Sequence, residues 1–243
     1  MKSRVKIHLL DDSLLGKGYH VVTGYKGFGA VGLIASLHIV RTLKMKRVGL
    51  ILTKYQPEYV FRDDNGLSFP YEIYASDENK LVVVVNREIP DERVRDEYVW
   101  SLTKFFKEAG MGPLYLIGGL DATYRENEND ELRWIATSGY NGPTPPDKMF
   151  EKGLLIVGPL ALQIMYAEIL GVPAIALLPY AQAETPDPAA AAVAISRLNG
   201  MLGIKVPTEE LLEEAVRIQE SLRKLEELVA RESQKNVRGE PYM

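Results

Sequence analysis

Three glycines, Gly27, Gly29 and Gly32, are spaced as G-x-G-x-x-G in the stretch "GFGAVG", directly after a strand-like segment. Glycines at this spacing let backbone N–H groups approach a pyrophosphate at the positive end of the following helix, so the motif is typical of dinucleotide sites. A nicotinamide site also needs an acid about 20 positions on, at the end of the next strand. Here that strand ends at Thr53, and the first acid after it is Glu58. Three interpretations stay open: a phosphate or nucleotide site, a nicotinamide site, and a tight turn whose glycines allow close helix–sheet packing, which we favour.

Two acids, Glu88 and Asp121, follow strand-like segments and would lie at the carboxyl edge of a sheet, where sites form in α/β proteins. Each is a candidate general acid or base, although a polar residue at the end of a strand more often forms a turn. The chain has no cysteine and three histidines, which excludes thiolate chemistry and supplies a metal site poorly. We therefore expect no catalytic residue, no cofactor and no metal.

The composition of the chain restricts the classes of partner that the protein can be expected to bind. The 243 residues are 46% hydrophobic and carry a formal net charge of −4, which gives no electrostatic footprint for nucleic acid. No apolar run approaches the roughly 20 residues of a membrane span, and the first residues lack the apolar region of a signal peptide. We expect a cytoplasmic protein whose partner is another protein or a small molecule, with no nucleic acid and no membrane.

Short apolar runs alternate with segments long enough for helices. The expected strands are Val5–Leu10, His20–Tyr25, Val48–Thr53, Leu81–Val85, Leu114–Ile117, Leu154–Val157 and Ala174–Leu178. The expected helices are Val31–Lys44, Asp91–Ala109, Pro159–Leu170 and Ala189–Leu202. Continuous apolar runs such as "VGLILT" are typical of buried parallel strands. The alternation predicts an α/β fold with a mostly parallel sheet covered by helices on both faces.

Two stretches interrupt this alternation. Between Tyr59 and Tyr74, aromatic residues alternate around a turn at "DDNG", which indicates a hairpin or an edge strand added to the main sheet. The stretch "TYRENENDEL" is typical of a solvated acidic loop. Because no linker or internal repeat divides the chain, we expect one α/β domain over residues 1–206, a helix over 207–233 and a flexible tail over 234–243.

The C-terminal helix is predicted from about Thr208, a good N-cap residue, to Glu232. Its apolar residues recur at steps of four and three and form a heptad stripe. They are Leu211, Ala215, Ile218, Leu222, Leu225 and Val229. The stripe packs either along its own domain or on another subunit. A helix of this length would measure about 37 Å, which favours some protrusion or a contact between subunits.

Six stretches, in the same order along nearly the whole chain, resemble the proteasome assembly chaperone family, especially its archaeal members. They are "GFGAVGLIAS", "IGGLDA", "GYNGP", "GLLIVGPLALQI", "GVPAIALLPYA" and "PDPAAAAVAISRLNGMLG". The resemblance implies an α/β sandwich related to the purine nucleoside phosphorylases but without their catalytic residues. It also implies a homo-oligomer, a tetramer or pentamer, that engages the proteasome core particle without nucleotide hydrolysis.

In such proteins a C-terminal hydrophobic-Tyr-any tripeptide inserts between neighbouring α-ring subunits, and the matching residues here are Pro241, Tyr242 and Met243. Pro241 departs from the bulky apolar residue that is usual at its position, and proline presets an extended backbone there. Two functions stay open. The first is a proteasome assembly chaperone or ATP-independent activator that docks on the α-ring through its tail. The alternative is a nucleoside phosphorylase-like or hydrolase-like enzyme, or a ligand-binding protein, of the same superfold.

Overall fold

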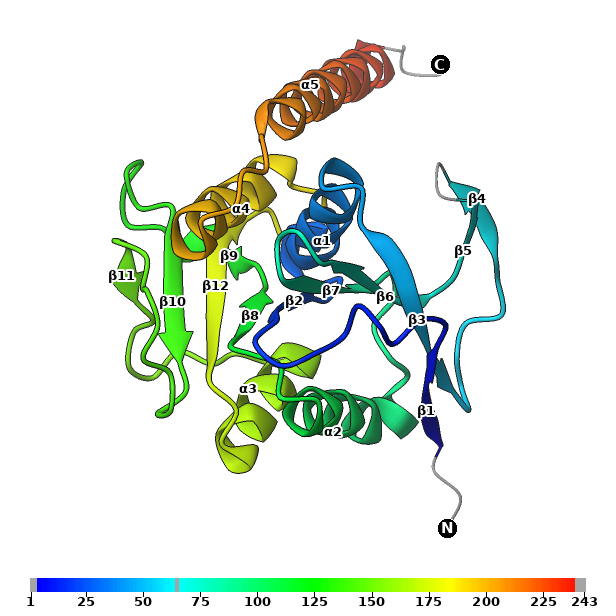
Figure 1. Cartoon of the computed structure of the whole chain (residues 1–243). Helices are drawn as coiled ribbons and strands as arrows, with labels where there is room; N and C mark the ends of the chain where they lie inside the picture. Colours follow the sequence, from blue (N-terminus) through cyan, green and yellow to red (C-terminus); the bar gives the residue numbers. More distant parts are fainter. Residues whose placement is uncertain (1–3, 64–65, 239–243) are drawn as a thin grey trace.

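The computed structural model contains one large sheet with helices on both faces, as Figure 1 shows. It describes residues 4–63 and 66–238, with side chains as far as Lys224. The strands of this sheet are β1 (Val5–Leu9), β2 (His20–Gly24), β3 (Lys46–Thr53), β6 (Tyr71–Ser76), β7 (Leu81–Asn86), β8 (Leu114–Ile117), β9 (Leu120–Asp121), β10 (Leu132–Ala136), β11 (Lys148–Met149) and β12 (Ala174–Ala181). The α-helices are α1 (Val31–Thr42), α2 (Glu92–Glu108), α3 (Gly158–Leu170), α4 (Pro188–Leu202) and α5 (Glu209–Arg238).

The sheet has a parallel centre and antiparallel flanks. Its strand order is β1-β3-β6-β7-β2-β8-β12-β10-β11, and β9 pairs with β12. Strands β7, β2, β8 and β12 run parallel to one another, whereas β1, β3 and β6 on one side and β10 on the other pair antiparallel. The predicted α/β fold is therefore confirmed, in the form of a mixed sheet.

Each face of the sheet has its own helix layer because the central strands are buried on both sides. In β7, Val82 and Val84 belong to the core beneath α2 and α3, while Val83 and Val85 belong to the core beneath α1 and α4. This alternation follows from the two-residue period of a strand. The unbroken apolar sequence of β7 is thus explained by two covering layers.

Two strand predictions need correction. The run Val48–Thr53 lies in β3, which is not parallel to its neighbours but pairs antiparallel with β1 and β6. The run Leu154–Val157 is not a strand at all; it forms an irregular loop in which Leu155 is 83% exposed and Val157 is 70% exposed. Gly153 and Gly158, both at positive φ, turn the chain at the two ends of this run, so it cannot extend along the sheet.

The interrupting stretches are also more ordered than expected. A hairpin does form, between β4 (Phe61–Asp63) and β5 (Gly66–Ser68), but β6 enters the main sheet between β3 and β7 instead of at its edge. The acidic stretch ends at Leu132, the first residue of β10, a strand that the sequence pattern did not predict. Asp130 in that stretch is buried, so the loop is not wholly solvated.

Helix α5 leads away from the rest of the chain, as Figure 1 shows in orange to red. It begins one residue after the expected N-cap Thr208 and continues past the expected end at Glu232 to Arg238. Residues 234–238, expected in the flexible tail, are helical. Among the described residues, none of the helices is both long enough and apolar enough to cross a membrane.

Candidate functional site

The base of α5 is fixed to the α1–α4 layer by polar contacts from both helices. His38 of α1 places Nε2 at 2.7 Å from the carbonyl oxygen of Pro207. A carbonyl can only accept, so Nε2 carries the proton and donates. Arg41 of α1 donates to Glu210 at 2.7 Å. On α4, the amide of Asn199 exchanges two hydrogen bonds with the backbone of Val206, at 2.8 and 3.0 Å. The entry to α5 is therefore held at several points.

The heptad stripe is buried only where α5 begins. Leu211 is 3% exposed and Ala215 is 9% exposed, Ile218 is half-buried, and Leu222 is 39% exposed. The side chains of Leu225 and Val229 lie outside the described residues. Within the described part, the stripe thus packs on its own domain for its first turns and then loses this contact. The first alternative, packing on its own domain, therefore holds for Leu211 and Ala215, and a contact of the later residues with another subunit stays a prediction.

Other apolar side chains on α5 also face solvent. Leu212 and Val216, which are outside the heptad stripe, are exposed. A groove of about 400 Å³ separates α5 from the start of α4 and the loop before it. It is lined by Leu212, Ala215, Ile218 and Leu222 from α5, and by Pro186 and Val193 among others from the opposite wall. Exposed apolar groups on two sides of one helix are typical of a surface that contacts another protein chain.

The tail residues Pro241, Tyr242 and Met243 lie outside the described residues. Their role in binding the proteasome stays a prediction. The described part of the chain places the base of α5 on the α1–α4 layer and carries the helix away from that layer (Figure 1).

The glycine turn is explained by close packing of backbone on backbone. A Cβ atom added at Gly32 would lie 2.6 Å from the carbonyl oxygen of Ile117, and one at Gly24 would lie 2.5 Å from the Cα of Gly32. Gly29 adopts a φ of 59° and its carbonyl accepts from Asp187 N at 2.8 Å. These contacts join α1, β2, β8 and the start of α4, which is the function that we favoured for the motif.

The two candidate acids have partners of their own, and within the described part of the chain no hydrogen bond joins them to each other. Asp121 accepts a hydrogen bond from the backbone N–H of Thr123 at 2.9 Å, and this bond is the main cause of its lowered pKa. Glu88 lies 3.4 Å from Lys26 Nζ and 3.5 Å from the hydroxyl of Tyr59. Asp121 therefore acts as a turn former, and Glu88 takes part in weak surface contacts.

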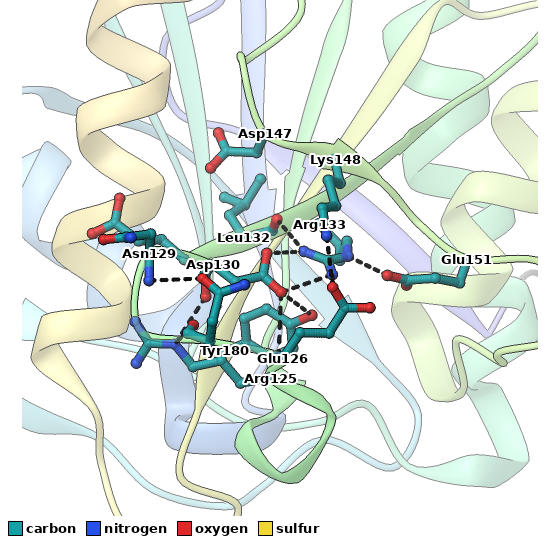
Figure 2. Close-up of polar contacts among 12 residues, drawn as sticks. Arg125, Glu126, Asn129, Asp130, Leu132, Arg133, Asp147, Lys148, Glu151 and Tyr180 are labelled. Carbon is teal, nitrogen blue, oxygen red and sulfur yellow. Dashed lines mark hydrogen bonds and ion pairs between the residues drawn. The ribbon is translucent and has the colours of Figure 1, made fainter.

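A buried ion cluster, centred on Arg133, was missed by sequence reasoning. Figure 2 shows the Arg133 guanidinium between the carboxylates of Asp130 and Glu151. Arg133 is fully buried, and its NH2 donates to Asp130 Oδ2 at 2.7 Å. Tyr180 adds its hydroxyl at 3.3 Å from the same oxygen. The hydrogen bonds from Arg133 hold the pKa of Asp130 below its usual range. The cluster ties the loop before β10 to the segment that follows β11.

A second buried carboxylate, Glu72 of β6, has no exposed side-chain surface. It accepts from Arg47 at 2.7 Å and from Arg87 at 2.9 Å, and the hydroxyl of Tyr74 donates to it at 3.1 Å. Arg87 also lies 3.3 Å from Asp63 of β4. This cluster thus ties the β4–β5 hairpin to the main sheet. Both clusters have an arginine or a glutamate within an otherwise apolar strand, which is the sequence signal that could have revealed them.

The sequence model of the PAC2 family matches residues 21–226. This range covers most of the chain, from β2 into α5, and the chain belongs to the PAC2 family. The resemblance based on the glycine turn and the later motifs is confirmed at the level of the family.

The relatives that match the chain include both chaperone homologues and an activator. The crystal structure of Pyrococcus furiosus PbaA, an archaeal homologue of proteasome-assembly chaperone, is similar with a TM-score of 0.80 at 22% identity, covering 97% of each chain. That of P. furiosus PbaB, an archaeal proteasome activator, has a TM-score of 0.74 at 19% identity and covers 92% of this chain and 99% of that one. An uncharacterized protein of Methanocaldococcus jannaschii is 25% identical over 84% of this chain and 82% of its own length.

Proposed function

We propose that this protein is a proteasome assembly chaperone or an ATP-independent activator, and that it docks on the proteasome α-ring through its C-terminal tail. The observation that carries this proposal is the arrangement of α5. Its base is held by His38, Arg41 and Asn199, while its later turns lead away from the domain. Such an arrangement is suited to presenting a chain end to a partner. Membership of the PAC2 family, and folds shared with PbaA and PbaB, support the same function.

The proposed tail has suitable chemistry for a slot between two subunits. Tyr242 would offer an apolar ring and a single hydroxyl, and the terminal carboxylate would pair with a lysine of the ring. Pro241 would supply a preset, extended backbone in place of a bulky apolar side chain. One such tail binds weakly, so several copies on one assembly would be needed for useful avidity. We therefore propose a homo-oligomer, a tetramer or pentamer, in the cytoplasm.

We propose that the protein acts without catalysis. The enzyme alternative needs a convergent acid, base and anion site at the carboxyl edge of the sheet. Asp121 is engaged as a turn former, Gly32 is required by its close packing against the carbonyl of Ile117, and a Cβ atom at Gly29 would meet Ala181 and Asp187. The close packing of the turn also supports our expectation that the protein uses no cofactor. The relation to purine nucleoside phosphorylases stays a prediction about ancestry of the fold.

Binding to immobilised recombinant α-rings tests the tail. Tyr242→Ala, deletion of residues 242–243, and one residue appended after Met243 should each weaken binding, because each removes the ring or displaces the carboxylate. The expected loss is about 1–3 kcal/mol per tail, multiplied across the copies of the assembly. Tyr124→Ala is the matched control, since Tyr124 is an exposed tyrosine of the folded body. Equal affinities for all five proteins would contradict docking through the tail.

A further inference from the structure

A concave site lies at the carboxyl edge of the sheet. None of the residues that line it takes part in the hydrogen bonds that hold the base of α5. The site is formed where β2, β8 and β12 end, and it is closed by the loop over residues 150–157 and by the first turn of α3. Its volume is about 390 Å³, within the roughly 300–1,000 Å³ range of small-molecule sites. We call it the edge cavity.

The walls of the edge cavity are almost entirely apolar. Its inner part is formed by buried residues, among them Ile117, Leu160 and Leu178. Its mouth is bordered by Phe28, Ile89, Leu155 and Val157, all of them exposed. An apolar ligand would gain about 25 cal/mol for each Å² of apolar surface removed from water on both sides of the contact. The irregular loop around Leu155 thus places exposed apolar side chains beside the cavity. A bound ligand would remove part of their surface from water.

Polar side chains in the cavity wall restrict the class of ligand. Tyr25 lines the cavity, but its hydroxyl already donates to Gln163 Oε1 at 2.6 Å, and burial raises the pKa of this phenol. A sugar or nucleoside would leave its hydroxyl groups without partners against such walls, which is costly. An aliphatic body fits them better.

Lys26 is the single charged residue among the described residues that line the cavity. Its side chain is half exposed, and its nearest carboxylate, that of Glu88, lies 3.4 Å away at the surface. An anionic group at the mouth would complement this charge. We propose that the edge cavity binds a small aliphatic monocarboxylate, with the alkyl chain inside the cavity and the carboxylate beside Lys26. This site is independent of the tail and of the proteasome.

The test is a titration of the full-length protein with the fluorescent fatty acid 11-(dansylamino)undecanoic acid, followed by displacement with decanoate. We expect saturable binding of one probe per chain and displacement by decanoate. Ala183→Trp should weaken probe binding at least about tenfold, because Ala183 is exposed and lines the cavity, so an indole there would occupy the space. Glu184→Trp is the matched control, since Glu184 is exposed but does not line the cavity.

A second pair of variants tests the head group. Lys26→Met should weaken decanoate about three- to fivefold, as expected for a half-exposed ion pair, and leave displacement by decan-1-ol unchanged. Lys17→Met is the control, an exposed lysine before β2 at its other end. Three results would overturn the proposal: no saturable binding, as when a second copy of the chain covers the mouth; equal binding by the two tryptophan variants; or equal loss of decanoate and decanol with Lys26→Met.

Discussion

The imidazole of His38 and the carbonyl of Pro207 are joined by a 2.7 Å hydrogen bond that connects α1 to the residue pair preceding α5. His38 is buried, so its replacement by alanine leaves the Pro207 carbonyl without this donor. We expect His38→Ala to lower the free energy of unfolding by about 1–2 kcal/mol and to speed amide hydrogen exchange over residues 208–212. His8→Ala, at an exposed position of β1, is the control. Unchanged exchange in His38→Ala would mean that α5 is held without this bond.

The N-cap of α2 predicts a pH dependence of stability. Asp91 accepts from Arg93 Nε at 2.8 Å and from the backbone N–H of Arg93 at 3.0 Å, and these bonds lower its pKa from 3.8 to about 2. A carboxylate whose pKa is depressed by folding stabilises the fold above its ordinary pKa and loses this contribution as the pH falls through the lowered value. Thermal melts of Asp91→Ala should therefore differ from the parent at pH 6 and approach it below about pH 2.

Asp91→Asn distinguishes the two parts of this effect. Asparagine is also a good N-cap residue, so this variant should keep most of the stability at pH 6 while losing the dependence on the Asp91 titration. If the alanine and asparagine variants melt together at pH 6, the capping bond to Arg93 N does not contribute to stability.

The ion cluster around Arg133 should be costly to break from one side. Asp130→Ala removes the carboxylate that faces the buried guanidinium and leaves that charge with Glu151 as its nearest partner. We expect a loss of about 3 kcal/mol in urea denaturation. Glu126→Ala is the control, since Glu126 is an exposed member of the same cluster at 3.9 Å from Arg133. A similar small loss in both variants would show that water compensates Arg133.

Glycines of the G-x-G-x-x-G motif should differ sharply in their tolerance of a side chain. Gly32→Ala would force its Cβ against the carbonyl of Ile117 and should destabilise the protein by about 1–3 kcal/mol. In Gly27→Ala the added Cβ meets no atom within 4 Å, so this variant should be nearly neutral in the same melts.

Calorimetry should detect no NAD or NADP binding by the parent. A dissociation constant of about 10 μM or better would contradict the packing interpretation.

Leu222 tests the predicted contact between subunits. Because Leu222 is partly exposed within one chain, Leu222→Asp should cost little in an isolated protomer but should introduce a charge into an apolar seam of an oligomer. Sedimentation velocity should show smaller particles for Leu222→Asp and unchanged particles for Ser221→Asp, which adds the same charge at the neighbouring exposed position. If both variants sediment like the parent, the stripe beyond Ile218 is not an interface.

Strands that are apolar throughout were predictable, whereas β10, which carries a buried charged residue, was not. Leu81–Val85 and Leu114–Ile117 are buried on both faces, so their composition alone identified them. In β10, Arg133 is charged yet fully buried, because Asp130 and Glu151 pair with it. Both partners lie outside the strand, so the sequence of the strand alone does not indicate that it is buried. A local sequence pattern does not contain partners that come from other segments.

The opposite error occurred at Leu154–Val157, where an apolar run lies at the surface and not in the sheet. Burial is favourable only where neighbouring elements supply a partner surface, and the pattern of a single segment does not report this. Strand direction was likewise beyond the pattern, because β3 pairs antiparallel through contacts with β1 and β6. For α5, the heptad period correctly predicted a helix, but the point at which Leu211 and Ala215 give way to the exposed Leu222 depends on where the domain ends.

Among its described side chains, α5 is attached to the domain at its base, so a small change of angle there moves its far end by a large distance. Its 30 residues span about 45 Å at 1.5 Å per residue, and its fixed contacts gather around Pro207 and Glu210. A change of about 10° in direction at this base displaces the far end by about 8 Å, more than the length of a tyrosine side chain. The position of the far end of α5 is therefore set by the hydrogen bonds and the buried Leu211 and Ala215 at its base, and small substitutions there act at a distance.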